Sequence, residues 1–153
     1  MSRLQPQTKQ ARSNCRFDVR LVEISRLKGH EELDPQRLIN LQAEIKADGI
    51  LKKPIAVDMN TNVVLDGHHR MGVLKLLGCS KIPVLLVDYQ SAIVGVKTTD
   101  RREEYPKSKV IDAAMTRKLL SPKSTWHYIS LSKQITHISE MQRRVDVPFN
   151  VLQ

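Results

Sequence analysis

The feature that most constrains the fold is residues 63–70, whose sequence Val-Val-Leu-Asp-Gly-His-His-Arg predicts a strand leading directly into a helix. A short β-branched run ends at Asp66, and Gly67 then supplies a tight turn. Apolar residues recur with helical spacing across residues 71–77, and Gly78 is the kind of residue that ends a helix. The stretch therefore predicts a strand–turn–helix corner.

A helix that begins directly after a glycine turn is a candidate anion site. The free N–H groups of a helix N-terminus carry partial positive charge, and His68, His69 and Arg70 add side-chain donors there. A phosphate group is the expected guest. Asp66 would repel a bare phosphate, and it fits the site if Mg²⁺ bridges the two or if the carboxylate handles a proton. The alternative is a plain corner with surface histidines and an Arg–Asp surface pair.

The rest of the chain predicts a mixed α+β domain followed by a small C-terminal lobe of helix and strand. Asp34-Pro35 is typical of a helix start, and Gly49 of a helix end. The polar residues 90–107 are expected to form a loop or a lid hinge. The other expected elements are strands over residues 17–24 and 82–87, a helix over 35–48, a hairpin of 55–59 with 62–65, a helix over 108–119, and an edge strand within 145–152.

The length of 153 residues corresponds to one domain, or to one domain with a small appendage. We expect a mobile basic arm over residues 1–15, a nucleotide-binding domain over 16–90, and a C-terminal lobe over 91–153 that carries a substrate loop. No apolar run approaches the roughly 20 residues that span a bilayer. With no signal-peptide pattern and only two cysteines, Cys15 and Cys79, we expect a soluble cytoplasmic protein without disulfides.

The chain carries 25 basic and 16 acidic residues, which gives a net charge of +9. Such a balance suits polyanionic partners, so nonspecific nucleic-acid binding through the basic surface is one expectation. Simple solubility explains the charge equally well. Aromatic residues make up only 4% of the chain, which argues against a protein that stacks single-stranded bases.

Three polar clusters lie between the expected elements, at residues 28–31, 66–70 and 121–127. Four of the five histidines fall inside these clusters, which suggests that the clusters converge on one site. A zinc site is an alternative, because histidine and glutamate are zinc ligands. It is disfavoured because the histidines lack a helical i,i+4 spacing and because the adjacent His68 and His69 seldom both reach one metal.

These clusters resemble the motifs of the free serine kinase branch of the ParB/sulfiredoxin-like fold. That branch carries Pro-His-Glu, Asp-Gly-His-His-Arg and Ser/Pro-Pro-Lys-Thr-Thr-Arg-His, in this order. The corresponding stretches here are Gly-His-Glu at 29–31, Asp-Gly-His-His-Arg at 66–70 and Ser-Pro-Lys-Ser-Thr-Trp-His at 121–127. The resemblance covers roughly residues 17–128 and implies phosphorylation of the hydroxyl of free L-serine to O-phospho-L-serine, with ATP or ADP as donor and Mg²⁺ as cofactor.

Carried over residue by residue, the resemblance implies a general base at Glu31 and a partner of Mg²⁺ or of the transferring phosphoryl group at Asp66. The expected contacts to the nucleotide phosphates are Gly67, His68, His69 and Arg70, and the expected contacts to serine are His30, Lys123, Ser124, Thr125 and His127. Trp126 stands where the motif has arginine, so one positive charge is missing. Sulfiredoxin chemistry is excluded, because its motif has a cysteine in the phosphate turn, where this chain has His68 and His69.

Two other functions remain open from the sequence. One is a ParB-like DNA-associated regulator, since the same fold serves such proteins and fold does not determine function. Against it, the chain is short and shows no convincing recognition helix. The other is a nucleotide-sensing module that kept the pocket and lost turnover. The sequence does not indicate an oligomeric state.

Overall fold

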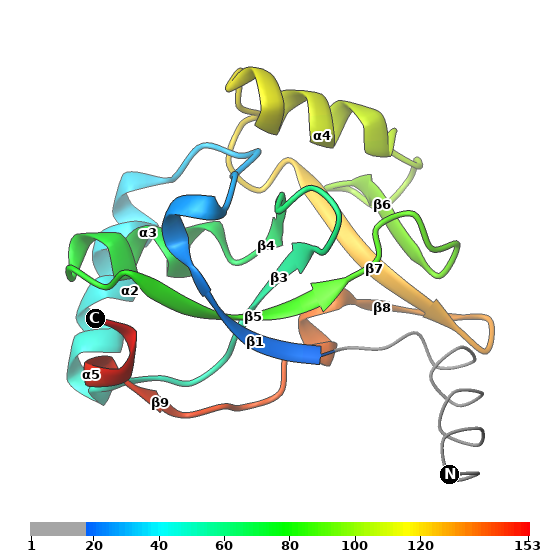
Figure 1. Cartoon of the computed structure of the whole chain (residues 1–153). Coiled ribbons are helices and arrows are strands. Elements are labelled where there is room, and N and C mark those ends of the chain that lie inside the picture. Colours follow the sequence, from blue (N-terminus) through cyan, green and yellow to red (C-terminus); the bar gives the residue numbers. More distant parts are fainter. Residues whose placement is uncertain (1–17) are drawn as a thin grey trace, which may run out of the picture.

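The computed structural model describes residues 18–153, and its centre is a four-stranded sheet in the order β1-β5-β3-β4 (Figure 1). Strand β5 runs antiparallel to β1 and parallel to β3, and β3 forms an antiparallel hairpin with β4. The bounds of these strands are Asp18–Glu23 for β1, Ile55–Asp58 for β3, Val64–Asp66 for β4 and Lys81–Val87 for β5. The predicted strands and hairpin of this region are therefore confirmed. Phe17, the arm over 1–15 and Cys15 lie outside the described residues.

Two helices cover one face of this sheet, α2 (Pro35–Asp48) and α3 (His68–Leu76). Because side chains alternate along a strand, Ile55 and Val57 of β3 face these helices, whereas Ala56 faces the other way. The buried residues under the helices form the larger core cluster, which also takes in the short helix α5 (Phe149–Leu152). The position of α3 over the sheet is what fixes the Asp66–Arg70 corner.

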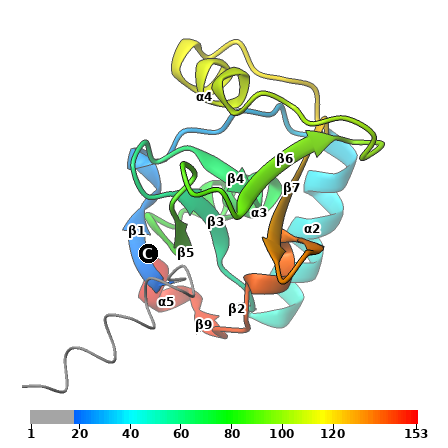
Figure 2. The ribbon, with the colours of Figure 1, turned by 90° about the vertical axis from the view of Figure 1, so that its right-hand side faces the viewer.

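The opposite face is covered by the C-terminal part of the chain (Figure 2). A three-stranded antiparallel sheet of β6 (Val94–Thr98), β7 (Thr125–Leu131) and β8 (Gln134–His137) packs there together with helix α4 (Lys107–Thr116) and the 3₁₀ turn η2 (Ile138–Met141). Residues from both sides of position 90 share this second core cluster. The boundary at residue 90 stays a prediction.

The loop predicted over residues 90–107 is wrong in part, because residues 94–98 form β6. Val94 and Val96 are buried on either side of Gly95 and pack into the second core cluster. A Cβ atom at Gly95 would lie 2.2 Å from the Tyr128 ring, so only glycine admits the neighbouring strand at this distance. A five-residue strand with glycine at its centre gives little sequence signal.

Two further predictions are corrected near the C-terminal lobe. The helix expected over residues 108–119 ends at Thr116, because Arg117 adopts a left-handed conformation with φ of 60°. The stretch 121–127 is not wholly a loop, since its last three residues begin β7. The hairpin of β7 and β8 was not predicted, because its turn residues Ser132 and Lys133 both have positive φ without the usual Asn or Gly.

The helix ends and the tail agree with the sequence. The Asp34 side chain accepts a hydrogen bond from the Gln36 N–H at 3.0 Å, and Gly49 closes α2 with φ of 74°. In the tail, β9 (Val147–Pro148) pairs with β2 (Ile50–Leu51), so the expected edge strand is confirmed together with its proline. Within residues 18–153, no helix has the length and apolar character needed to cross a bilayer.

Candidate active site

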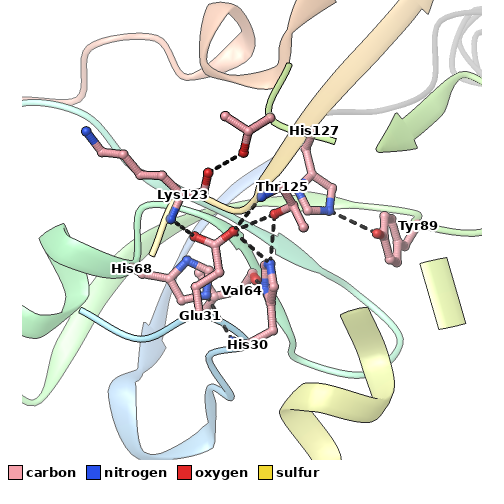
Figure 3. Close-up of polar contacts among 9 residues, drawn as sticks. His30, Glu31, Val64, His68, Tyr89, Lys123, Thr125 and His127 are labelled. Carbon is pink, nitrogen blue, oxygen red and sulfur yellow. Dashed lines mark hydrogen bonds and ion pairs between the residues drawn. The ribbon is translucent and has the colours of Figure 1, made fainter. Parts of the chain in front are cut away.

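The three polar clusters meet at one open cavity of about 600 Å³. Glu31 comes from the loop after β1, residues 66–70 from the β4–α3 corner, and Lys123 and Thr125 from the start of β7. Figure 3 shows that Glu31 of the first cluster lies in direct hydrogen-bond contact with Lys123 and Thr125 of the third. The convergence predicted from the positions of the histidines is therefore observed.

Helix α3 presents its N-terminus to this cavity. Gly67 precedes the helix with φ of 104°, and no side chain among residues 18–153 caps the first turn. An uncapped first turn leaves backbone N–H groups for a ligand, and the helix dipole adds partial positive charge. The corner therefore has the geometry of an anion site, as its sequence predicts.

His68 and His69 are buried, with 5% and 8% of their surface exposed, so they are not surface histidines. The His68 Nε2 accepts a hydrogen bond from the backbone N–H of His30 at 3.0 Å, and the His69 Nε2 accepts one from Asp34 at 2.9 Å. Both rings consequently carry their proton on Nδ1 and are neutral. They hold the loop of residues 30–34 in place, and each has one remaining N–H to offer a ligand.

Burial lowers the pKa of His68 to about 3, with a further contribution from the nearby His30. Burial also lowers the pKa of His69, and that of His127 well below its usual value of 6.5. These histidines are therefore neutral at physiological pH. A neutral imidazole can donate to phosphate, but it contributes no net positive charge to the cavity.

Acidification is expected to destabilise the fold through these histidines. In the unfolded chain His68 takes up a proton as the pH falls through 6.5, whereas in the folded protein its pKa is about 3. Between pH 6.5 and about pH 3 the unfolded state binds more protons than the folded state. The free energy of unfolding therefore falls by about 1.4 kcal/mol for each unit by which the pH drops below 6.5. Urea unfolding at about pH 7.5 and about pH 5.5 measures this slope. The His68→Asn variant should show a shallower slope, and an unchanged slope would contradict the assignment.

Glu31 joins the first cluster to the third through several hydrogen bonds. Its carboxylate accepts the backbone N–H groups of Lys123 and Thr125, each at 3.1 Å, and the Thr125 hydroxyl at 2.5 Å. His30 Nε2 lies 3.5 Å from the same carboxylate. Burial opposes ionisation, but the hydrogen bonds from His30 and Thr125 outweigh it and lower the pKa of Glu31 to about 2. Glu31 is thus an ionised carboxylate at the cavity wall.

His30 is fully buried and lies behind Glu31. Its Nδ1 lies 2.7 Å from the Val64 carbonyl oxygen, which can only accept, so Nδ1 carries a proton. Its Nε2 faces the Thr125 hydroxyl at 3.2 Å. The predicted contact of His30 to serine stays a prediction, and within the protein His30 contacts Glu31 and Thr125.

Asp66 and Arg70 form an ion pair of 3.3 Å that a third residue completes. The Gln142 amide donates to the Asp66 carboxylate at 2.8 Å and accepts from the Arg70 guanidinium at 2.8 Å. Gln142 is 2% exposed and lies 72 residues beyond Arg70 in the chain. Gln142 was not predicted as a site residue, because residues 138–144 show no motif or periodicity.

The magnesium prediction at Asp66 fits this arrangement. The hydrogen bonds from Arg70 and Gln142 both reach Oδ2, so Oδ1 remains for a metal ion. Mg²⁺ commonly uses one or two carboxylates together with substrate phosphates and water. The zinc alternative is not supported, since residues 18–153 contain no group of three or more His, Cys, Asp or Glu placed to hold a metal.

The third cluster is arranged partly as predicted. The Lys123 side chain points away from the Glu31 carboxylate and borders the cavity (Figure 3). The Ser124 hydroxyl is buried and has no hydrogen-bond partner among residues 18–153. His127 is 2% exposed and its Nε2 lies 2.9 Å from the Tyr89 hydroxyl, so it reaches only the back of the cavity.

Several residues of the cavity wall were not predicted as site residues, and three of them are Thr99, Arg101 and Trp126. Arg101 and Thr99 come from the turn after β6, which was expected to be a loop without a site. Trp126, which stands where the motif has arginine, was not predicted as a site residue, and it too borders the cavity. The Arg101 guanidinium lies over the Trp126 ring, 4.8 Å from its centroid. A positive charge is therefore present next to Trp126, although from a different part of the chain.

No protein-family model matches the chain. It is 37% identical over 82 residues to a protein named ATP-dependent L-serine kinase from Staphylothermus marinus, a match that covers 51% of this chain and 32% of the relative. It is 30% identical over 87 residues to the ADP-dependent L-serine kinase SerK of Thermococcus kodakarensis, covering 54% and 36%. A ParB-like protein of Sulfolobus acidocaldarius matches at 35% over 85 residues, covering 56% and 42%. Each match thus spans less than half of the relative's length.

Solved structures extend the similarity along the chain. A free serine kinase in complex with AMP aligns with a TM-score of 0.71 at 16% identity and covers 90% of this chain and 95% of that one. A conserved hypothetical protein from Pyrococcus furiosus aligns with a TM-score of 0.73 at 15% identity, covering 90% and 98%. The resemblance predicted from the three motifs is confirmed. About half of this chain is similar in sequence to proteins named L-serine kinase, and 90% of it is similar in fold to a free serine kinase.

Proposed function

We propose that this protein transfers a phosphoryl group from ATP or ADP to the hydroxyl of free L-serine, forming O-phospho-L-serine. The observation that carries the proposal is one cavity in which ionised Glu31 shares the wall with Asp66, Arg70 and the uncapped N-terminus of α3. Phosphoryl transfer needs positioned donors, a metal ion and an oriented hydroxyl more than covalent chemistry. Relatives named for both donors support the nucleotide and the acceptor.

In this proposal the nucleotide phosphates lie at the start of α3. The backbone N–H groups after Gly67, the remaining Nδ1–H groups of His68 and His69, and the Arg70 guanidinium supply the donors. Asp66 would hold Mg²⁺, and the ion would neutralise charge that builds up on the transferring group. Gln142 keeps Asp66 and Arg70 in their relative orientation.

The serine oxygen attacks the terminal phosphorus, and the bond from that phosphorus to the bridging oxygen breaks. The leaving nucleotide takes the electron pair, and the hydroxyl proton passes to the Glu31 carboxylate and then to water. A carboxylate with a pKa of about 2 is a weak base. In a loose transition state the hydroxyl proton leaves late, so we propose that Glu31 first orients the serine hydroxyl by accepting its hydrogen bond.

Free serine would approach from the side of β7. Lys123, Ser124 and Thr125 are the proposed contacts, because Lys123 and Thr125 border the cavity and the Ser124 hydroxyl lies between them in the chain without a partner among residues 18–153. His30 and His127 are proposed to support these residues from behind. ATP, ADP and free serine are cytoplasmic metabolites, so the proposal includes a cytoplasmic location.

Replacing Arg70 by alanine is expected to weaken nucleotide binding at least about tenfold, because hydrogen bonds to charged groups contribute roughly 1.5 to 3 kcal/mol. Calorimetric titration with ATP and with ADP in the presence of Mg²⁺ measures the effect. Lys75→Ala is the matched control, since Lys75 is an exposed cation on the same helix. Equal affinities for the two variants would contradict a phosphate site at this corner.

The alternatives from the sequence gain no specific support. The name of the ParB-like relative states no activity, and nothing in residues 18–153 favours a DNA-reading element. Nonspecific nucleic-acid binding through the +9 charge stays a prediction, as does a sensor without turnover. Incubation with L-serine, Mg²⁺ and either nucleotide, followed by detection of O-phospho-L-serine, distinguishes the kinase from both alternatives.

A further inference from the structure

Arg101 is held over the cavity by an aromatic platform. Its guanidinium lies 4.8 Å from the centroid of the Trp126 ring, and both residues border the cavity. The Trp126 ring is itself fixed by Tyr128, which stacks on it at 5.9 Å, and by His137 at 5.6 Å. A guanidinium on a tryptophan face is attracted by the ring and keeps its N–H groups available at the edge.

The turn that carries Arg101 is well defined by hydrogen bonds. The Arg101 N–H donates to the Thr98 carbonyl at 2.7 Å, and Asp100 accepts the Thr98 hydroxyl at 2.6 Å. The Thr99 hydroxyl donates to the Lys123 carbonyl, which ties this turn to the third cluster. Arg101 and Lys123 both have positive φ, of 63° and 55°.

The charge of Arg101 is not neutralised by a carboxylate. Within the described part of the chain no ion pair involves Arg101, whereas the next residue, Arg102, pairs with Asp100 at 3.9 Å. The cavity wall carries further cations at Arg37, Lys53, Arg70 and Lys123, against the two carboxylates Glu31 and Asp66. An unpaired arginine in such a wall is a binding element for a ligand with several negative charges.

We propose that Arg101 is a catalytic residue that binds the oxygens of the transferring phosphoryl group and stabilises their charge in the transition state. This inference rests on the proposed kinase function. Arg101 comes from the turn after β6, whereas the other donors come from the N-terminus of α3, so the group would be held by two separate elements. Arg101 forms no covalent bond and accepts no proton in the step.

Replacing Arg101 by alanine is expected to lower kcat about 10²-fold or more, since positioned arginines of this kind contribute up to 10³ to 10⁵. The KM for serine should change by only a few-fold, because the proposed contact is to the phosphoryl group of the donor and not to serine. Added guanidinium ion should restore part of the rate to Arg101→Ala. The matched control is Arg102→Ala, because the Arg102 side chain is 84% exposed and forms its pair away from the cavity. Equal kcat for the two variants would overturn the proposal.

Nucleotide affinity tests the same contact without turnover. In the absence of serine, Arg101→Ala should bind the phosphoryl donor, ATP or ADP, at least tenfold more weakly, because it loses a charge-assisted hydrogen bond to the terminal phosphate. Its affinity for AMP should not change, because AMP lacks the transferring group. This pattern would uphold Arg101 as a phosphate ligand even if the wild-type protein phosphorylates no serine. Equal losses for donor and AMP, no loss for either, or no nucleotide binding by the wild type would overturn it.

Discussion

Replacing Glu31 by glutamine is expected to reduce the rate of serine phosphorylation by about 10²- to 10⁴-fold, the usual contribution of a positioned acid–base group. The amide can still accept a hydrogen bond, but it cannot take a proton from the serine hydroxyl. Its NH₂ group would also face one of the three donors that now reach the carboxylate, from Lys123 and Thr125. Nucleotide affinity should be retained, because the phosphate donors belong to α3.

Glu32→Gln is the matched control, because Glu32 is the adjacent acid and is exposed. Its backbone N–H donates to the Leu120 carbonyl at 2.8 Å, a bond that the substitution leaves intact. Steady-state rates for the two variants, together with their urea unfolding curves, separate lost chemistry from lost stability. A Glu31→Gln protein that phosphorylates serine at a rate close to wild type would refute the assignment.

Replacing Gly67 by alanine is expected to destabilise the protein by about 2 to 5 kcal/mol, the sum of a positive-φ penalty and of overpacking. Gly67 has φ of 104°, and a Cβ atom there would lie 2.3 Å from Ile55 Cγ2 in the core and 3.0 Å from the Arg70 guanidinium. The clash would move the β4–α3 corner itself. Nucleotide affinity should therefore fall along with stability.

Gly78→Ala separates the two contributions, since Gly78 also has positive φ, of 78°, but has no atom within 4 Å of the added Cβ among residues 18–153. We expect it to lose only about 1 to 2 kcal/mol from backbone strain. Urea midpoints compared at equal m-values measure both variants. Equal losses at the two glycines would show that Ile55 yields to the extra carbon and that packing does not require glycine at position 67.

The parts of the fold that could be predicted are those encoded by neighbouring residues. The Asp34-Pro35 start, the Gly49 end and the corner at 66–70 each depend on the conformational preferences of one or two residues, and each is found in the structure. The convergence of the polar clusters was predicted because four of the five histidines fall inside three short polar stretches of the chain. Local encoding of this kind is what a single sequence reveals best.

The missed features depend on contacts between distant segments. Strand β6 can pair with β7 because Gly95 leaves room for the Tyr128 ring. This need for glycine cannot be read from the residues around position 95 alone. Gln142 acts on Asp66 and Arg70 from more than 70 residues away, and its own surroundings in the chain are unremarkable. Arg101 was overlooked because a charged turn is more often simply solvated. In each case tertiary structure gives the residue its role.

Phosphorus NMR on the wild-type protein with L-serine, Mg²⁺ and either ATP or ADP tests the central claim most directly. The account predicts a resonance of O-phospho-L-serine that grows as the terminal phosphate of one donor disappears, with no such signal when serine is omitted. Binding of nucleotide without any phosphoserine from either donor, or release of inorganic phosphate alone, would contradict the kinase assignment.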